Sequence, residues 1–503
     1  MSKLPHGGVP RFRGAQCLRY LRESCAALSE AYSNVRTEAE EETNPDDPRT
    51  RIRKEIEEAG LFPHLPNLLS LVYDFYCERV LRTTEEMQLR YLLLLLFVLD
   101  EHFEQEPLQV YSDAQGDVLL GRRWWASVAR HEERRRPINF GRSVHDAYPH
   151  LRILGQNIRV AQNVNTALAF AQLGSVESLR IACCTLSGQA RTNFVGTGPF
   201  NWGRGPHFGF RATHVGAPND RGRVTNPESA YIDELRNTLT RARREAVHVL
   251  FLPELSVCEQ GRSVLRDAIE LDPGDLILVV PGSFHVSGVG SNAVVNAAPV
   301  WLVHRDPDAA GGKVVTALQA EKSEIFDLPT ARGEGVIGLK DPVDGARSAG
   351  FDQLAEHIVP SSTVQLLDTP VGSLLVLICK DALVGPVDGH VQRAVAAADH
   401  VVVVSMNANP RAWFSPVALL WQRTGTATYY VNSAQALNGA SPSMLELAAA
   451  ITPRGLKDAT GTFYGQVGFR DNLPLQSSIS PELRATLVDD WFCVDIPAPR
   501  MLR

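Results

Sequence analysis

The feature that most constrains the fold is a series of short apolar segments between about residues 178 and 435. These segments are rich in β-branched residues and are separated by polar loops, which is typical of buried strands. They are Leu179–Leu186, Val247–Leu252, Leu276–Val280, Ala293–Ala297, Pro299–His304, Val364–Leu367, Leu374–Ile378, Val401–Ser405 and Thr428–Val431. Helical spacing of apolar residues at 229–246, 388–398 and 415–424 predicts strand–helix alternation, and therefore an α/β fold with a buried sheet.

The N-terminal third shows a different pattern, which predicts an all-α accessory domain. Segment 14–32 has helical spacing, and a capping-box pair, Thr83 and Glu86, precedes the apolar run Leu92–Leu99. That run is about a third of the length that a membrane-spanning helix needs. We therefore expect three parts, which are a helical domain over 1–175, an α/β domain over 176–440 and a C-terminal extension over 441–503.

Composition and charge exclude several classes of protein. The chain has 503 residues, a formal net charge of −7 and a pI of about 6.1, so it has no general attraction to nucleic acid or anionic membranes. The basic segment Arg122–Arg136 is interpreted as a solvated helix face, because Glu132 and Glu133 dilute its charge.

The 8 cysteines form no CxxC pair and the N-terminus lacks the apolar core of a signal peptide. We expect a cytoplasmic protein without a metal or a cofactor.

Three residues stand where strand-like segments end. Glu254 follows the segment Val249–Leu252 and a proline, Cys379 follows Leu374–Ile378, and Lys322 follows a strand-like stretch from Val314. Functional sites of α/β folds form at the carboxyl ends of strands. A thiol at such an end can face a pocket, while the next backbone N–H groups point at a developing oxyanion. Taken singly, each residue has an ordinary interpretation as an exposed glutamate, a core cysteine or a surface lysine.

Taken together and in this order, these motifs resemble the nitrilase, or carbon–nitrogen hydrolase, superfamily over about residues 178–435. The lysine lies four residues before Phe326, and the cysteine stands in an Ile-Cys-x-Asp context. Further segments fit the resemblance, namely Pro281-Gly282-Ser283 after a strand, Asn292-Ala293 at the start of the next strand, and Arg423 before the last strand.

The resemblance implies a four-layer α-β-β-α sandwich and a role for each matching residue. Cys379 is the expected nucleophile of a thioester mechanism, Glu254 the base, and Lys322 the stabiliser of the oxyanion together with the backbone N–H of Lys380. A second glutamate is expected before the cysteine strand. Glu356, in a Glu-x-x-x-Pro context, is preferred, and Glu334 is the alternative.

The expected substrate is a small amide or nitrile, with amides favoured, and the expected assembly is a homo-oligomer with a protein partner for the helical domain. The alternative is a nitrilase-like binding or signalling module with little or no catalysis.

The interval from Lys322 to Cys379 is longer than is usual in the superfamily, and its segment 328–350 is predicted to be a mobile loop. Four scattered histidines lack metal-like spacing and are interpreted as structural residues. They are His285, His304, His357 and His390.

Overall fold

The chain was analysed as a computed structural model. Its contacts divide it into two compact units, residues 1–126 with 137–156 and residues 127–136 with 157–503. The structure describes residues 100, 103, 108–113, 116–123, 150–174, 176, 178–186, 193–203, 205–213, 227–287, 294–305, 311–333, 339–382, 390–407, 426–433, 448–451 and 491–497.

The described part of the first unit contains a sheet where the sequence predicted only helices. Its antiparallel strands are β1 (Gln109–Asp113), β2 (Gly116–Leu120) and β3 (Leu151–Ile153). All five residues of β2 are buried, so this strand has no polar face that alternation would reveal. The all-α prediction is therefore wrong for these residues, while the predicted helices before residue 100 lie outside the described residues.

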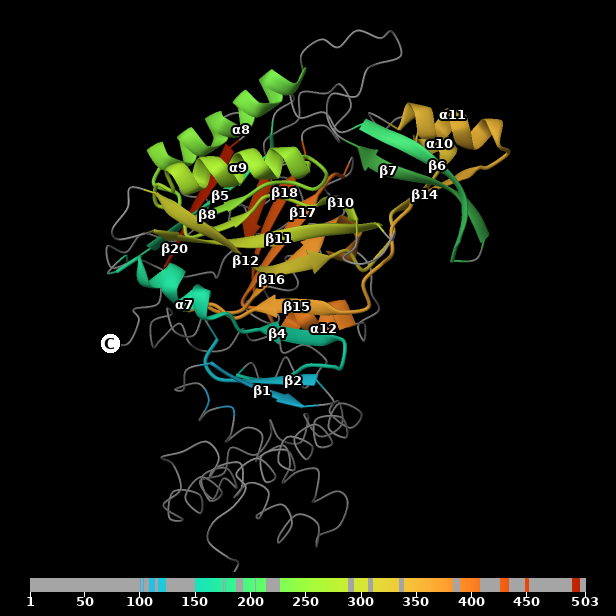
Figure 1. Ribbon diagram of the computed structural model, residues 1–503. Helices are drawn as coiled ribbons and strands as arrows, with labels where there is room; N and C mark the ends of the chain where they lie inside the picture. Colours follow the sequence, from blue (N-terminus) through green and yellow to red (C-terminus); the bar gives the residue numbers. More distant parts are fainter. Residues whose placement is uncertain are drawn as a thin grey trace, which may run out of the picture. The chain divides into compact units, whose positions relative to one another are not determined.

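The second unit is built on two large sheets, here named sheet I and sheet II (Figure 1). The centre of sheet I is parallel, since β5 pairs with β8 and β8 with β9 in the same direction. In spatial order its strands are β10 (Phe284–Ser287), β11 (Val294–Arg305), β9 (Leu278–Val280), β8 (Val249–Phe251), β5 (Ser178–Cys184) and β20 (Trp491–Pro497), with β12 (Gly312–Glu321) also paired to β11.

Sheet II is also parallel at its centre, where β16, β17 and β18 run side by side. Every residue of these three strands is buried, so both faces of sheet II are covered. In spatial order its strands are β19 (Ala448–Ile451), β18 (Ala427–Asn432), β17 (His400–Ser405), β16 (Leu374–Ile378), β15 (Val364–Leu367) and β4 (Ile158–Ala161).

The two sheets pack face to face, with helices on the outer side of each. Between the sheets, the rings of Phe251 on β8 and Tyr429 on β18 lie 5.6 Å apart. Helices α8 (Pro227–Arg244) and α9 (Glu259–Leu271) lie together over sheet I, and α12 (His390–Ala397) packs against β15 of sheet II (Figure 1). The short α7 (Val164–Ala171) contacts β11. The α/β prediction is thereby confirmed.

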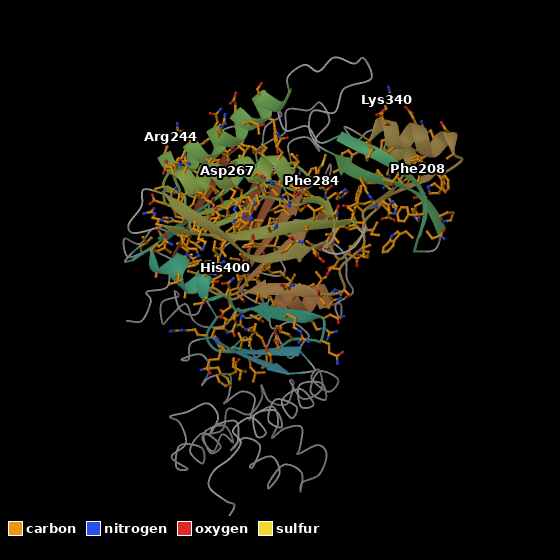
Figure 2. The ribbon with its side chains drawn as sticks, viewed as in Figure 1. Phe208, Arg244, Asp267, Phe284, Lys340 and His400 are labelled. Atoms are coloured by element: carbon orange, nitrogen blue, oxygen red, sulfur yellow. The ribbon has the colours of Figure 1, made fainter. Side chains whose placement is uncertain are left out.

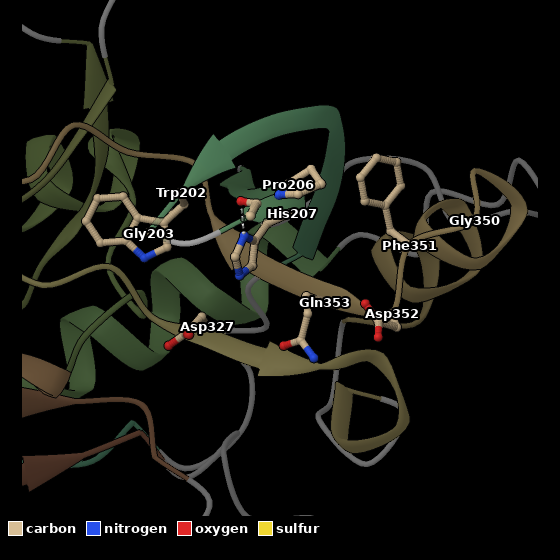
Figure 3. A pocket seen from close by; sticks show the side chains of 10 residues that line it. Trp202, Gly203, Pro206, His207, Asp327, Gly350, Phe351, Asp352 and Gln353 are labelled. Carbon is tan, nitrogen blue, oxygen red and sulfur yellow. Dashed lines mark hydrogen bonds between the residues drawn. The ribbon is translucent and has the colours of Figure 1, made fainter.

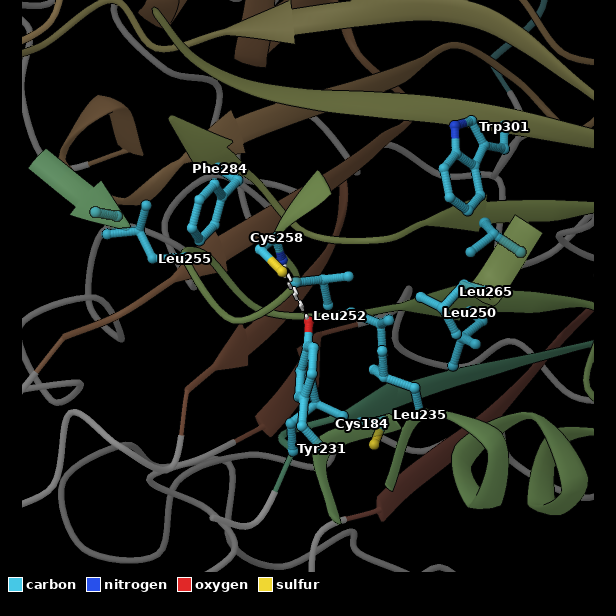
Figure 4. Close-up of a cluster of buried hydrophobic side chains, with 14 of the residues drawn as sticks. Cys184, Tyr231, Leu235, Leu250, Leu252, Leu255, Cys258, Leu265, Phe284 and Trp301 are labelled. Carbon is cyan, nitrogen blue, oxygen red and sulfur yellow. Dashed lines mark hydrogen bonds between the residues drawn. The ribbon is translucent and has the colours of Figure 1, made fainter. Parts of the chain in front are cut away.

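The core between the helices and sheet I follows from the helical spacing of the sequence. On α8 the buried residues Leu235, Leu239 and Ala242 recur at intervals of four and three, which places them on one face. They pack with Leu250 and Leu265 in a cluster that Figure 4 shows, where Tyr231 also reaches Cys258.

Strand β11 is one continuous strand, although the sequence predicted two strands around a proline. Pro299 lies between the residues that pair with β10, which end at Ala297, and those that pair with β9, which begin at Trp301. Proline cannot donate a ladder hydrogen bond, and at this point β11 has no partner on that side to receive one. A bulge at Val300 and Trp301 follows on the other side, towards β12.

A smaller sheet, here named sheet III, is formed by strands from two regions, about 193–213 and 327–356, in which the sequence predicted no strand. Its strands are β13 (Asp327–Pro329), β14 (Gln353–Glu356), β7 (Gly205–Thr213) and β6 (Asn193–Trp202). The second region also contains the helices α10 (Thr330–Gly333) and α11 (Lys340–Ser348).

Helix α11 packs on the hairpin of β6 and β7, so the prediction of a mobile loop over 328–350 is wrong for its described residues. Phe208 on β7 packs beside α11, close to Gly345, and its ring lies 6.1 Å from that of Phe351 (Figure 2). The two lie so close that a Cβ added at Gly345 would meet the Phe208 ring at 3.1 Å, and the ring would have to shift by a few tenths of an ångström. High glycine content and short elements conceal this packing from the sequence pattern.

The segment predicted as a C-terminal extension contributes an edge strand to each large sheet. Strand β20 pairs with β5 of sheet I, and β19 pairs with β18 of sheet II. At the edge of sheet II opposite to β19, strand β4 pairs with β15. The predicted domain boundaries stay predictions. Among the residues described, no helix combines the length and apolar character needed to cross a bilayer.

Candidate active site

Cys379 lies at the point where β16 ends, with its side chain buried. Its φ angle is 46°, a left-handed conformation that costs a residue with a side chain about 1–3 kcal/mol. The neighbouring strand β17 ends in register with it, because Ile378 pairs with Val404. The next residue, Ser405, donates its hydroxyl to the Cys379 Sγ over 3.7 Å. Such strain is kept where it positions a side chain, which here is the thiol.

Glu254 lies beyond the end of β8 in the opposite sheet and is 2% exposed. The residue after it, Leu255, is also left-handed, with φ 54°. The turn passes close to Gly282, where an added Cβ would collide with the carbonyl oxygen of Pro253. From sheet II, the backbone N–H of Met406 donates to Glu254 Oε2 over 3.0 Å, so the carboxylate links the ends of β8 and β17.

Lys322 follows β12 and ties the two predicted glutamates together. Its Nζ donates to Glu254 Oε1 over 2.8 Å and to Glu356 Oε2 over 2.7 Å. All three side chains are 2% exposed. Burial by itself lowers the pKa of Lys322, but the charges of Glu254 and Glu356 outweigh it and raise that pKa well above its ordinary value. The lysine is therefore a fixed ammonium group at neutral pH.

Glu356 is the last residue of β14 in sheet III and receives hydrogen bonds at both carboxylate oxygens. Besides Lys322, its donors include the backbone N–H of Phe326 at 3.3 Å. Burial raises the pKa of Glu356, whereas Lys322 and then His285 lower it, and the net result is a pKa well below its ordinary value. The structure thus brings Glu356 to the same cluster as Glu254 and Lys322. The alternative glutamate, Glu334, lies outside the described residues.

Asn296 is a member of the cluster that the sequence interpretation missed. It lies on β11 and is fully buried, and its Nδ2 donates to Glu254 Oε1 over 3.0 Å and to Glu356 Oε1 over 2.9 Å. The reverse orientation of the amide would set its oxygen against two carboxylates, so the two hydrogen bonds fix it. The sequence motif had been placed at Asn292, which lies outside the described residues. A lone asparagine inside an apolar strand is the signal that could have found Asn296.

Burial and the charges of this cluster together determine the protonation state of the Cys379 thiol. Two carboxylates and one ammonium group leave one net negative charge beside Cys379. Burial first, and the carboxylate of Glu254 second, raise the pKa of Cys379 to about 12, against a smaller lowering by Lys322. Cys379 is therefore a neutral thiol at neutral pH. Attack by its sulfur requires that the proton leave to a base, and Glu254 is the carboxylate that acts on this thiol.

The residues after Cys379 form a short 3-10 helix, η2 (Cys379–Ala382). The N–H groups of a first helical turn have no helical partner, which makes the backbone N–H of Lys380 suited to bind an oxyanion. The side chain of Lys380 instead turns to Asp327, with 2.5 Å between Nζ and Oδ1. The buried Asp381 accepts the N–H groups of Ser323 and Glu324 at 3.0 and 2.8 Å, and so fastens η2 to the loop that carries Lys322.

A separate cavity of about 550 Å³ lies on sheet III, and none of the four cluster side chains lines it (Figure 3). Its wall includes the turn between β6 and β7. The lining residues are Trp202, Gly203, Gly205, Pro206, His207, Asp327, Gly350, Phe351, Asp352 and Gln353. One of them, Asp327, is the partner of Lys380.

The other candidates from the sequence are two cysteines, two histidines and an arginine. Cys183 and Cys184 are buried in β5. His285, interpreted as structural, instead bonds to Glu356, with 2.7 Å between Nε2 and Oε1. His357 stacks on Phe200, and Arg423 lies outside the described residues. Within the described ranges, no three His, Cys, Asp or Glu side chains gather in a group that could hold a metal ion.

Comparisons with known proteins return solved structures alone. No family model matches the chain, and no curated protein matches it. One similar structure is Saccharomyces cerevisiae Nit3, described as a member of branch 10 of the nitrilase superfamily, with 11% identity, a TM-score of 0.35, and coverage of 64% of this chain and 91% of Nit3. Another is a glutamine-dependent NAD(+) synthetase from Cytophaga hutchinsonii, with 11% identity, a TM-score of 0.25, and coverage of 51% and 36%.

Proposed function

We propose that the protein is an amidase-type hydrolase of non-peptide carbon–nitrogen bonds, on a nitrilase-like four-layer α-β-β-α sandwich. One observation carries the proposal. A strained cysteine at a strand end shares a buried site with a glutamate that can take its proton and with a lysine held between two carboxylates. These are the parts that nucleophilic acyl transfer needs, namely a nucleophile, a base and a source of positive charge.

In the acylation step, Glu254 takes the proton of the Cys379 thiol while the sulfur attacks the carbonyl carbon of the amide. The negative charge that develops on the carbonyl oxygen is stabilised by the third N–H of Lys322 and by the backbone N–H of Lys380. Glu254 then returns the proton to the leaving nitrogen. The carbon–nitrogen bond breaks, ammonia or an amine departs, and a thioester on Cys379 remains.

In the deacylation step, Glu254 removes a proton from water as the water oxygen attacks the thioester carbon. The carbon–sulfur bond breaks, the proton passes to sulfur, and the carboxylic acid is released. Glu254 has the same role in both halves, which suits a carboxylate fixed from three sides by Lys322, Asn296 and the Met406 N–H.

The burial of the cluster favours a small substrate, and we propose an amide rather than a nitrile. We further propose that the enzyme is cytoplasmic, works as a homo-oligomer and uses its N-terminal part to bind a protein partner.

The first test compares release of ammonia from a panel of small carboxamides by the parent protein, Cys379→Ala and Cys493→Ala. Removal of the nucleophile is expected to reduce turnover by about 10⁴-fold or more. Cys493→Ala, the control at another buried cysteine, should stay within about twofold of the parent. Equal turnover by all three proteins would contradict the proposal, because hydrolysis would then not need Cys379. No turnover by any of the three would also contradict it and would favour a nitrilase-like binding module.

A further inference from the structure

His285 is a buried histidine whose two ring nitrogens both have defined partners. It lies on β10 beside the candidate site, and its side chain is 2% exposed. Its Nδ1 faces the backbone N–H of Ala212 on β7, at 2.8 Å. Its Nε2 faces Glu356 Oε1 at 2.7 Å. The ring therefore connects β10 of sheet I with Ala212 on β7 and Glu356 on β14, both in sheet III.

These partners fix the tautomer of the ring. A backbone N–H can only donate, so Nδ1 must keep its lone pair to accept from Ala212. The proton of the neutral imidazole is then on Nε2, from which it is donated to Glu356. Full protonation would put a second N–H on Nδ1 and set it against the N–H of Ala212. His285 is thus held as a neutral donor that points at the carboxylate.

With His285 in this state, each partner of the Glu356 carboxylate among the described residues is a donor. They are His285 and Asn296 at Oε1, and Lys322 and the Phe326 N–H at Oε2. A carboxylate surrounded by donors stays ionised and does not take up a proton during turnover. Its part is then to hold the Lys322 ammonium group, which leaves proton transfer to Glu254.

Strand β7 fixes both ends of this bridge. Glu356 on β14 pairs with Phe210 of β7, and Ala212, the donor to His285, lies two residues further along the same strand. The N–H of His357 also bonds to the carbonyl of Phe210 at 2.9 Å. One strand of sheet III therefore determines where Glu356 and the His285 ring stand relative to each other.

We propose that His285 is a positioning residue for the hydrolytic site, which donates Nε2–H to Glu356 and depends on β7 for its tautomer. The effect on turnover rests on the proposed function, because Glu356 acts there by holding Lys322. The tautomer itself is a property of the folded protein and can be measured without any substrate.

The sharpest test uses two substitutions that each keep one of the two ring positions. In His285→Asn, a side-chain oxygen can replace Nδ1 and accept from Ala212, but the donor to Glu356 is lost. In His285→Gln, the longer amide can replace Nε2 and keep that donor. We expect kcat for amide hydrolysis to fall about 10- to 100-fold in His285→Asn, with KM within about twofold, and to recover to within a few-fold of the parent in His285→Gln. His304→Asn, at a histidine on β11 outside the cluster, is the control and should match the parent.

Two kinetic results would overturn the proposal. One is a His285→Asn variant as active as the parent, and the other is equal impairment of both variants, which indicates a role in packing alone. Nitrogen-15 NMR of labelled histidine, assigned by comparison with His285→Gln, should show Nε2 protonated and Nδ1 unprotonated, and the opposite tautomer would also overturn it. If the parent has no Cys379-dependent turnover, the proposed function fails, and the NMR result alone decides the state of His285.

Discussion

Cysteine, glutamate and basic side chains come together at Cys379 and again at Cys493. Cys493 lies on β20, 6% exposed, and its Sγ is 3.5 Å from Glu245 Oε2. Glu245 in turn bonds to Arg241 at 2.9 Å. The pKa of Cys493 is raised to about 12, first by burial and then by Glu245, as that of Cys379 is by burial and Glu254. Neither the residue types nor the acidity of the thiol distinguishes the two regions.

The difference lies in backbone position and in exposure. Cys493 stands within a strand and pairs with Ala182, whereas Cys379 ends its strand in a left-handed conformation. Glu245 is 27% exposed and forms ion pairs with arginines at the surface, whereas Glu254 is 2% exposed. A site of this type therefore depends on strand ends that converge and on a base enclosed from water.

The comparison predicts that Lys322 matters far more than its counterpart Arg241. Lys322→Met leaves two carboxylates in a buried space without their cation, and loss of one partner of a buried ion pair costs about 3–5 kcal/mol. Arg241→Met, which breaks a partly exposed pair and a contact with the Trp491 ring, should cost about 1 kcal/mol. Urea unfolding of the two variants measures both changes.

A second substitution controls for other damage at Lys322. The double variant Lys322→Met/Glu356→Gln also lacks one of the two carboxylates that Lys322→Met leaves without a cation. Part of the stability lost in Lys322→Met should therefore return. Equal losses in Lys322→Met and Arg241→Met would remove the distinction between the two regions.

The next prediction concerns the two glutamates. Glu254→Gln keeps the shape of the side chain but cannot take a proton, so kcat for amide hydrolysis should fall about 10²- to 10⁴-fold. Glu245→Gln, the matched change beside Cys493, should leave kcat within about twofold. Steady-state kinetics on the same carboxamide measure both. Similar losses would mean that the substitution acts through stability rather than through proton transfer.

The smallest expected effect is the response of the thiols to pH. Because the pKa of both cysteines is raised to about 12, each is a neutral thiol at pH 7–9, and its thiolate fraction rises with pH. The rate of alkylation by iodoacetamide, followed by peptide mass spectrometry, should rise about tenfold per pH unit at Cys379 with no plateau. A plateau near neutral pH at Cys379 would mean a preformed thiolate, and Glu254 would not be needed as its base.

The strand ends of the site could be predicted because each leaves a local signal. Val364–Leu367 and Leu374–Ile378 are the strands β15 and β16 with the predicted bounds, and Cys379 follows directly. A polar residue after an apolar run locates the end of a parallel strand, and the order of Glu254, Lys322 and Cys379 supplied the rest. The cluster geometry that unites them involves strands from three sheets, which periodicity within one segment cannot report.

Other parts leave no such signal. His285 has an unremarkable sequence context, and its role depends on Ala212 and Glu356, each about 70 residues away along the chain. Sheet III has glycines within its strands, and the segment 328–350 contains a helix. The sequence pattern of this region was therefore interpreted as that of a loop. The partner of β5 at the sheet edge is β20, whose sequence segment suggested only an extension.

The most direct measurement is to locate the acyl group during turnover. The parent protein would be mixed with para-nitrophenyl acetate, an activated acyl donor, quenched in acid and digested for peptide mass spectrometry. The account predicts an acetyl group on Cys379 and none on Cys493, with the adduct persisting longer in Glu254→Gln once formed, because water then lacks its base. Acetylation spread equally over the buried cysteines, or turnover of carboxamides without any adduct and with full activity in Cys379→Ala, would contradict it.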